Sequence, residues 1–254
     1  MKAGFVLLLA VLVVAACGGS PGDPVTPAPN LTGNWTIDSS ESATGALPQT
    51  LFNLTGALQS SGSEVTGILR PAILSQGTPC LLPVLNLKGS INSHRDLTLA
   101  SALPNGTIIK LSLALSVGQP YAGTVELDGG SCPIPSTAVT GMEIANTSGT
   151  FSGALTPEIT GSTAASTQGN GTLVLTQSTT PDSTGRFPAT GTLSYKFESC
   201  SGSVALAGSV TGPSIILSAA GEVNQSSQTL TLSGGVDISA SKIAALLVFH
   251  PIPC

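Results

Sequence analysis

The residue types that most often perform chemistry are sparse in this chain, with two histidines, five cysteines and 13 acidic side chains among 254 residues. General acids and bases are most often histidines, and His94 and His250 lie far apart with no shared motif around them. No Gly-x-Ser-x-Gly nucleophile motif stands between a strand and a helix. We therefore expect no catalytic site, no bound cofactor and a protein that is not an enzyme.

One tripeptide, His94-Arg95-Asp96, matches the His-Arg-Asp sequence of the protein-kinase catalytic loop. No glycine-rich phosphate loop, strand lysine or Asp-Phe-Gly accompanies it, so we expect a polar turn between two strands. A zinc site is also disfavoured, because four-cysteine zinc sites present close cysteine pairs and no Cys-x-x-Cys occurs. No metal ligand is therefore predicted.

The first residues have the order of an export signal, with Lys2 as the positive start, an apolar run over residues 5–14, and small alanines after it. The run is too short to span a membrane, which takes about 20 residues. Val14-Ala15-Ala16-Cys17 resembles the bacterial lipobox, which implies cleavage before Cys17 and its acylation by fatty acids such as palmitate. The residue after Cys17 is Gly18 rather than Asp, which resembles the outer-membrane sorting signal of bacteria with two membranes.

These features predict a cell-envelope protein that lipid on Cys17 holds at a membrane, with the outer membrane favoured. Four prolines among Gly, Ser and Thr make residues 18–30 an extended spacer. Once Lys2 is removed, seven basic residues stand against 13 acidic ones, and this balance of −6 disfavours nucleic acid as a partner. The sequence specifies neither a ligand nor a protein partner.

The fold class indicated by the sequence is all-β. Apolar residues alternate with small polar ones in several segments, which is the two-residue period of half-buried strands. These alternating residues are Leu54, Gly56 and Leu58; Leu85, Leu87 and Gly89; Leu111, Leu113 and Leu115; Leu173 and Leu175; Val204 and Leu206; Leu230 and Leu232. Turn clusters at residues 60–63, 104–106 and 181–185 separate them, as in an antiparallel meander. Residues 240–247 suit a helix or a strand equally.

The chain also repeats itself. Residues 85–91 match residues 204–210 at an offset of 119 (204 − 85), and Leu111-Ser112-Leu113 falls over Leu230-Thr231-Leu232 at the same offset. Gly33-Asn34-Trp35 falls over Gly149-Thr150-Phe151 at 116 (149 − 33). We therefore expect two tandem copies of one barrel-like or meander unit. The predicted organisation is a signal peptide at 1–16, lipidated cysteine and linker at 17–30, β-domain 1 at 31–145 and β-domain 2 at 146–254.

The duplication favours one disulfide within each copy. Four cysteines permit three pairings, and equivalent units favour Cys80 with Cys132 and Cys200 with Cys254. The separations are similar, 52 (132 − 80) and 54 (254 − 200), and export places the thiols in an oxidising compartment. Each closed loop of this length would stabilise its unit by about 4 kcal/mol.

The segment Leu31-Thr32-Gly33-Asn34-Trp35-Thr36 resembles the opening strand of lipocalins and of avidins. This resemblance implies a barrel or closed meander in which the tryptophan plugs one end. Biotin binding in avidins needs further tryptophans, and this chain has one. As a whole the chain resembles bacterial lipoproteins rich in Gly, Ser and Thr, which implies no particular activity.

Three functions follow from these observations. The first is a non-enzymatic binding or envelope-structural module attached to a membrane. The second is a lipocalin-like carrier of small hydrophobic ligands, which requires barrels with wide apolar interiors. The third is an envelope hydrolase, which requires His94 or His250 beside a serine and a carboxylate.

Overall fold

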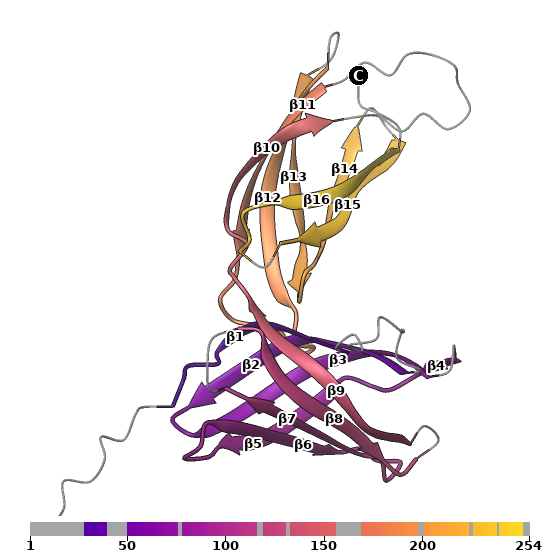
Figure 1. Ribbon diagram of the computed structural model, residues 1–254. Helices are drawn as coiled ribbons and strands as arrows, with labels where there is room; N and C mark the ends of the chain where they lie inside the picture. The colour runs from indigo at the N-terminus through magenta and orange to yellow at the C-terminus, as the bar shows by residue number, and fades with distance from the viewer. Residues whose placement is uncertain are drawn as a thin grey trace, which may run out of the picture.

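The computed structural model describes residues 28–39, 50–75, 78–115, 119–130, 133–155, 169–197, 201–223, 226–237 and 239–250. In these residues the regular structure consists of 16 β-strands in two antiparallel sheets (Figure 1), which confirms the all-β prediction. Within the same residues, no helix has the length and apolar character needed to cross a membrane.

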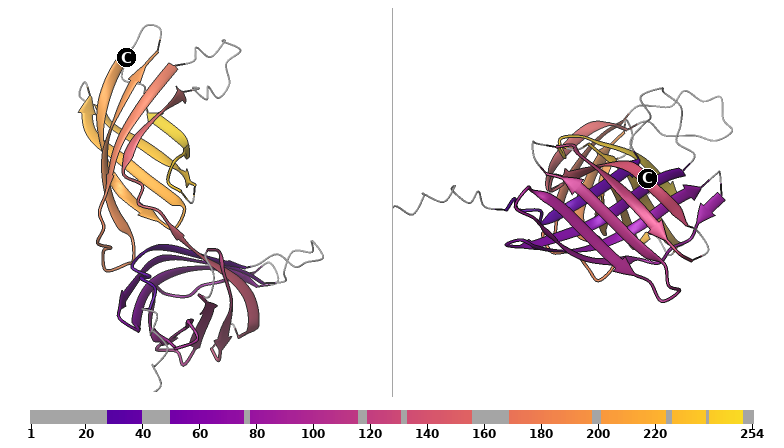
Figure 2. Two further views of the ribbon diagram at one scale, coloured as in Figure 1. Left: turned by 60° about the vertical axis from the view of Figure 1, so that its left-hand side comes forward. Right: turned by 60° about the horizontal axis from the view of Figure 1, so that its bottom comes forward.

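The first sheet contains nine strands from the N-terminal half. They are β1 (Gly33–Ser39), β2 (Thr50–Ser61), β3 (Glu64–Ser75), β4 (Thr78–Cys80), β5 (Leu85–Ile91), β6 (Asp96–Ala102), β7 (Ile108–Ala114), β8 (Tyr121–Asp128) and β9 (Ile134–Ile144). Leaving the short β4 aside, every strand pairs with two antiparallel neighbours, and β1 pairs with both β2 and β9. Eight strands therefore close into a barrel (Figure 2), while the short β4, labelled in Figure 1, pairs with the end of β3 beyond the ring.

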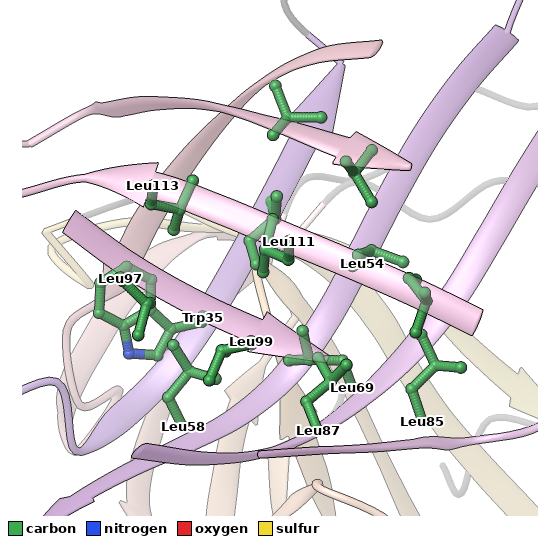
Figure 3. Close-up of a cluster of buried hydrophobic side chains, with 14 of the residues drawn as sticks. Trp35, Leu54, Leu58, Leu69, Leu85, Leu87, Leu97, Leu99, Leu111 and Leu113 are labelled. Atoms are coloured by element: carbon green, nitrogen blue, oxygen red, sulfur yellow. The ribbon is translucent and has the colours of Figure 1, made fainter. Parts of the chain in front are cut away.

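Large branched side chains fill the interior of this barrel (Figure 3). The two-residue period of the strands directs every second side chain inward, and the sequence places leucine at most of these positions. Trp35 lies near one end of this cluster, fully buried, and its Nε1 donates a hydrogen bond to the Leu31 carbonyl at 2.9 Å. The other largest buried side chains are Leu31, Ile37, Leu54, Leu58, Leu69, Leu85, Leu87, Leu97, Leu99, Ile109 and Leu111. The barrel is thus a packed core, as expected for eight strands.

The second sheet contains seven strands from the C-terminal half. They are β10 (Gly149–Leu155), β11 (Gly169–Gln177), β12 (Phe187–Lys196), β13 (Ser201–Thr211), β14 (Ser214–Val223), β15 (Ser226–Val236) and β16 (Ile243–His250). They pair in sequence order as a meander that curls into an incomplete barrel (Figure 2). Residues 243–250, part of the segment that suited helix or strand equally, form β16.

The two sheets repeat the same strand arrangement, which confirms the predicted duplication. Gly89 of β5 faces Leu99 of β6, and Gly208 of β13 faces Leu217 of β14 in the same way. A Cβ atom at either glycine would overlap a carbonyl oxygen of the facing strand, that of Thr98 or of Ile216. The same close approach of two strands therefore recurs in each copy.

One detail of the sequence alignment is wrong by two residues. Leu111 faces Leu99, and the residue that faces Leu217 is Leu232. Leu111 thus corresponds to Leu232 rather than Leu230, at a separation of 121 (232 − 111). The β14–β15 hairpin is longer than the β6–β7 hairpin. Matching the spacing of leucines cannot detect this difference, because moving the alignment by two residues keeps the same side chains on the inward face.

The two sheets contact each other through a buried amide. Asn34 Nδ2 donates to the Gly212 carbonyl at 2.8 Å, and the Gly212 N–H donates to Asn34 Oδ1 at 2.7 Å. Four residues, 145–148, connect β9 to β10, and Thr147 N donates to Gln177 Oε1 at 2.9 Å. The short connection and the buried amide together fix one sheet above the other (Figure 1).

Candidate functional site

The predicted lipid and disulfide sites fall almost entirely outside the described residues. Cys17, Cys132, Cys200 and Cys254 lie there, while Cys80 ends β4 with its backbone described and its side chain not. Lipidation and both disulfides therefore stay predictions.

The kinase-like tripeptide forms the turn between β5 and β6. Asn92 holds this turn, since its Oδ1 accepts hydrogen bonds from the backbone N–H of His94 at 2.9 Å and of Asp96 at 2.8 Å. Arg95 has a positive φ of 64°, and its N–H donates to the Asn92 carbonyl at 3.0 Å. These contacts are those of a polar turn, as the sequence analysis expects.

His250 ends β16, and its side chain lies outside the description. His94 is exposed on the turn described above. Among the described residues, no group of three or more His, Cys, Asp and Glu side chains could hold a metal ion. The structure thus brings none of the candidate catalytic residues together within the described part of the chain.

The feature that stands out is the open seam of the second sheet, defined as the region between β10 and β16. In the first barrel, β9 pairs with β1 on one side and with β8 on the other. The counterparts of β1 and β8 are β10 and β16, and each pairs with only one strand among those described. Within the described residues, both edges of the seam therefore present unpaired backbone groups, which favour the addition of another strand.

An apolar pocket of about 150 Å³ lies at this seam. Phe151 and Leu155 of β10 line one side, Ile243 of β16 lines the other, and Leu173, Leu193 and Leu232 lie at its base. Phe151 is only partly buried, whereas Trp35, its counterpart in the closed barrel, is completely buried. Gly153 faces open space, because a Cβ placed on it would meet no atom within 4 Å.

A hydrogen-bonded turn positions the start of β16. Lys242 N donates to Asp237 Oδ1 at 2.9 Å, and the hydroxyls of Ser239 and Ser241 donate to Asp237 Oδ2 at 2.9 and 2.7 Å. The Ser241 hydroxyl above all, with the Lys242 N–H, lowers the pKa of Asp237 to about 2. The pocket itself is lined by uncharged residues, so its recognition chemistry is apolar side chains and strand-edge hydrogen bonds.

The closed barrel shows which kind of strand fits such a seam. Among the buried residues of β9 are Val139 and Gly141, and Gly141 faces Ile37 of β1 on one side and Tyr121 of β8 on the other. A Cβ at Gly141 would meet Leu113 Cδ1 at 2.8 Å, so there is little room for a larger residue. A strand suited to this place is extended, with small residues such as Val139 and Gly141 where it faces the interior.

The seam was not predicted from the sequence, although one signal was available. The aligned repeats match β1 to β10 and β7 to β15, and extending the alignment through β8 shows no described counterpart of β9. Comparison with known proteins adds nothing to this geometry: no family model matches the chain, and searches of curated proteins and of solved structures find no match.

Proposed function

We propose that this protein is a lipoprotein of the bacterial cell envelope, anchored in the outer membrane, that acts as a non-enzymatic binding module. Its second sheet accepts an extended segment of a partner protein as an eighth strand. The observation that carries this proposal is the pair of unpaired edges, β10 and β16, on either side of an apolar pocket.

Strand addition matches the chemistry of the seam. Main-chain hydrogen bonds to a sheet edge provide affinity, and pockets for alternate side chains provide specificity. The edges of the seam provide the main-chain hydrogen bonds, and the apolar pocket between Phe151 and Ile243 provides the side-chain pocket. The antiparallel pairing of β9 with its two neighbours is the template for the partner strand.

The membrane attachment rests on the sequence. The lipobox-like residues before Cys17 and the proline-rich spacer after it support an anchor that holds both sheets at a distance from the bilayer. Two or more acyl chains on one cysteine give stable anchoring.

The carrier function has less support. The interior of the first barrel is occupied by side chains such as Leu54, Leu87 and Leu111, and the pocket of the second sheet is small. Ligand pockets usually measure about 300–1,000 Å³. The hydrolase function has no support in the described residues, since His94 is exposed on a turn and its ring forms no hydrogen bond with a serine or a carboxylate there.

Hydrogen–deuterium exchange with a peptide probe tests the strand acceptor. The probe is a synthetic peptide of residues 134–144, the sequence of β9, and the control is a peptide with the same residues in scrambled order. We expect the β9 peptide to slow amide exchange in β10 and β16, because both edges gain hydrogen bonds, and to leave the closed barrel unchanged. Equal exchange with both peptides, or edges already protected without peptide, would contradict the proposal.

A Gly153→Trp variant adds a second arm to this experiment. A Cβ at Gly153 meets no atom within 4 Å, and Gly153 lines the pocket, so the new side chain can enter the space where the partner strand places its own side chains. We expect the variant to fold and to lose the protection by the β9 peptide. Retained protection would show that the pocket plays no part.

The anchor and the disulfides have separate tests. Mass spectrometry of the membrane fraction should find acyl chains on Cys17, and a Cys17→Ser variant that stays tightly membrane-bound would refute the anchor. Peptide mapping without reductant should link Cys80 to Cys132 and Cys200 to Cys254. A link between Cys80 and either later cysteine would refute pairing within each copy.

A further inference from the structure

A second cavity lies where the two sheets meet. It has a volume of about 420 Å³, and β2 and β3 of the barrel line one side while β13 and β14 of the second sheet line the other. Its size falls within the usual range of ligand sites. We call it the intersheet cleft, and its polar residues are Asn53, Thr55, Arg70, Arg186, Ser209, Thr211, Ser214 and Ser218.

Two arginines from different sheets line this cleft. Arg70 lies on β3 opposite Thr55, and Arg186 directly precedes β12. The turn before Arg186 rests on the barrel, because a Cβ at Gly185 would overlap the carbonyl oxygen of Ile68, two residues before Arg70. The chain has only three arginines, so the convergence of two on one cleft is a specific feature of this fold.

Within the described part of the chain, neither guanidinium has a hydrogen-bond or ion-pair partner. The Asp182 carboxylate is close enough for the charge of Arg186 to act on it, but its hydrogen bonds come from donors other than the guanidinium groups, as do those of Asp38. Asp182 Oδ1 accepts the Thr184 N–H at 2.8 Å and the Arg186 N–H at 3.1 Å, and Asp38 Oδ1 accepts Asn53 Nδ2 at 2.5 Å. Guanidinium groups bind carboxylates and phosphates through paired N–H donors, and these donors stay available in the cleft.

Hydroxyl groups line the same cleft as the two arginines. Thr55 comes from the barrel, and Ser209, Thr211, Ser214 and Ser218 come from the second sheet. Each hydroxyl can donate one hydrogen bond and accept others, which suits a ligand that carries many hydroxyls of its own. None of the described residues that line the cleft is aromatic, so charge and hydrogen bonds from these residues select the ligand.

We propose that the intersheet cleft binds an acidic saccharide, with its anionic group on Arg70 and Arg186 and its hydroxyls on the serine and threonine side chains. This site is separate from the open seam, since the two cavities share no lining residue. The site also depends on how the two sheets are placed relative to each other, because each sheet supplies one of its arginines.

Calorimetric titration of the full protein tests this proposal with three probes: trigalacturonate, which carries charge and hydroxyls, maltotriose, which carries hydroxyls alone, and inorganic phosphate, which carries charge alone. We expect trigalacturonate to bind at least tenfold more tightly than either other probe, and to bind more weakly as salt rises. Equal affinity for maltotriose would overturn the role of charge, and equal affinity for phosphate would overturn the saccharide.

Charge variants locate the binding. Arg70→Gln and Arg186→Gln should each lower the affinity for trigalacturonate about tenfold. Arg70→Lys should lower this affinity less than Arg70→Gln does, because lysine keeps the positive charge. The matched control is Lys196→Gln, which removes the same charge at the far end of β12, about 30 Å from Arg186 along the strand. If the control weakens binding as much as the arginine variants, or if the arginine variants bind like the unaltered protein, the cleft is not the site.

Discussion

Asn34 pairs with Gly212 across 178 residues of sequence, and this pairing joins the barrel to the second sheet. The amide of Asn34 satisfies both the N–H and the carbonyl of Gly212, in the manner of a neighbouring strand. Gly212 has a φ of +52°, and a Cβ there would approach Thr55 Cγ2 to 2.5 Å. A glycine is therefore required where the β13–β14 turn meets the barrel.

Asn34→Ala should lower the free energy of unfolding by about 2 kcal/mol, because it leaves two buried backbone groups of Gly212 without partners. Urea unfolding followed by circular dichroism measures this loss. Asn86→Ala is the matched control, since Asn86 is an exposed strand residue. Equal stability of the two variants would mean that the amide does not hold the sheets together.

The sequence predicts the strands well and the long-range contacts poorly, for physical reasons. Alternation of Leu85 and Leu87 with exposed neighbours reports which face is buried, and it needs no knowledge of the rest of the fold. The pairing of Asn34 with Gly212 depends on how two finished sheets dock. Neither residue carries a local signal of this contact, since Asn34 is simply the middle residue of a Gly-Asn-Trp segment.

The same distinction applies to the sites. The turn at His94 could be predicted because Asn92 and its hydrogen bonds lie within five residues. The convergence of Arg70 and Arg186 on one cleft could not, because each belongs to a different sheet. The open seam could be predicted in part. The repeat was visible in the sequence, but the pairing of β9 in the structure was needed to identify the strand that lacks a counterpart.

Gly89→Ala and Gly208→Ala should each destabilise the protein by about 2 kcal/mol or more. The added Cβ would overlap a backbone carbonyl of the facing strand, which cannot move aside as a side chain can. Gly153→Ala serves as the control because its Cβ enters open space. Thermal unfolding of the three variants is the measurement, and a clear loss at only one of Gly89 and Gly208 would show that the two copies are not equivalent there.

Asp237 should titrate with a pKa near 2 in the folded protein, below its ordinary value of 3.8. Because the folded pKa is the lower one, the carboxylate favours the folded state above pH 3.8, and this contribution disappears as the pH falls toward 2. Carboxyl NMR shifts measure the titration. Ser241→Ala should raise the pKa more than Ser239→Ala does, since the Ser241 hydroxyl lowers it most. An equal response to both substitutions would contradict this assignment.

Trp35 and Phe151 occupy equivalent positions in the two copies but should contribute unequally to stability. Trp35 is fully buried, stacks on Tyr121 with ring centroids 5.9 Å apart, and donates to the Leu31 carbonyl, so Trp35→Ala should cost about 3–5 kcal/mol. Phe151 lines the open seam and is only partly buried, so Phe151→Ala should cost about 1–2 kcal/mol, since less apolar surface returns to water. Chemical denaturation of both variants gives the comparison. A Phe151→Ala loss as large as that at Trp35 would mean that the seam is closed in solution, and a bound β9 peptide should enlarge the Phe151 effect by covering its ring.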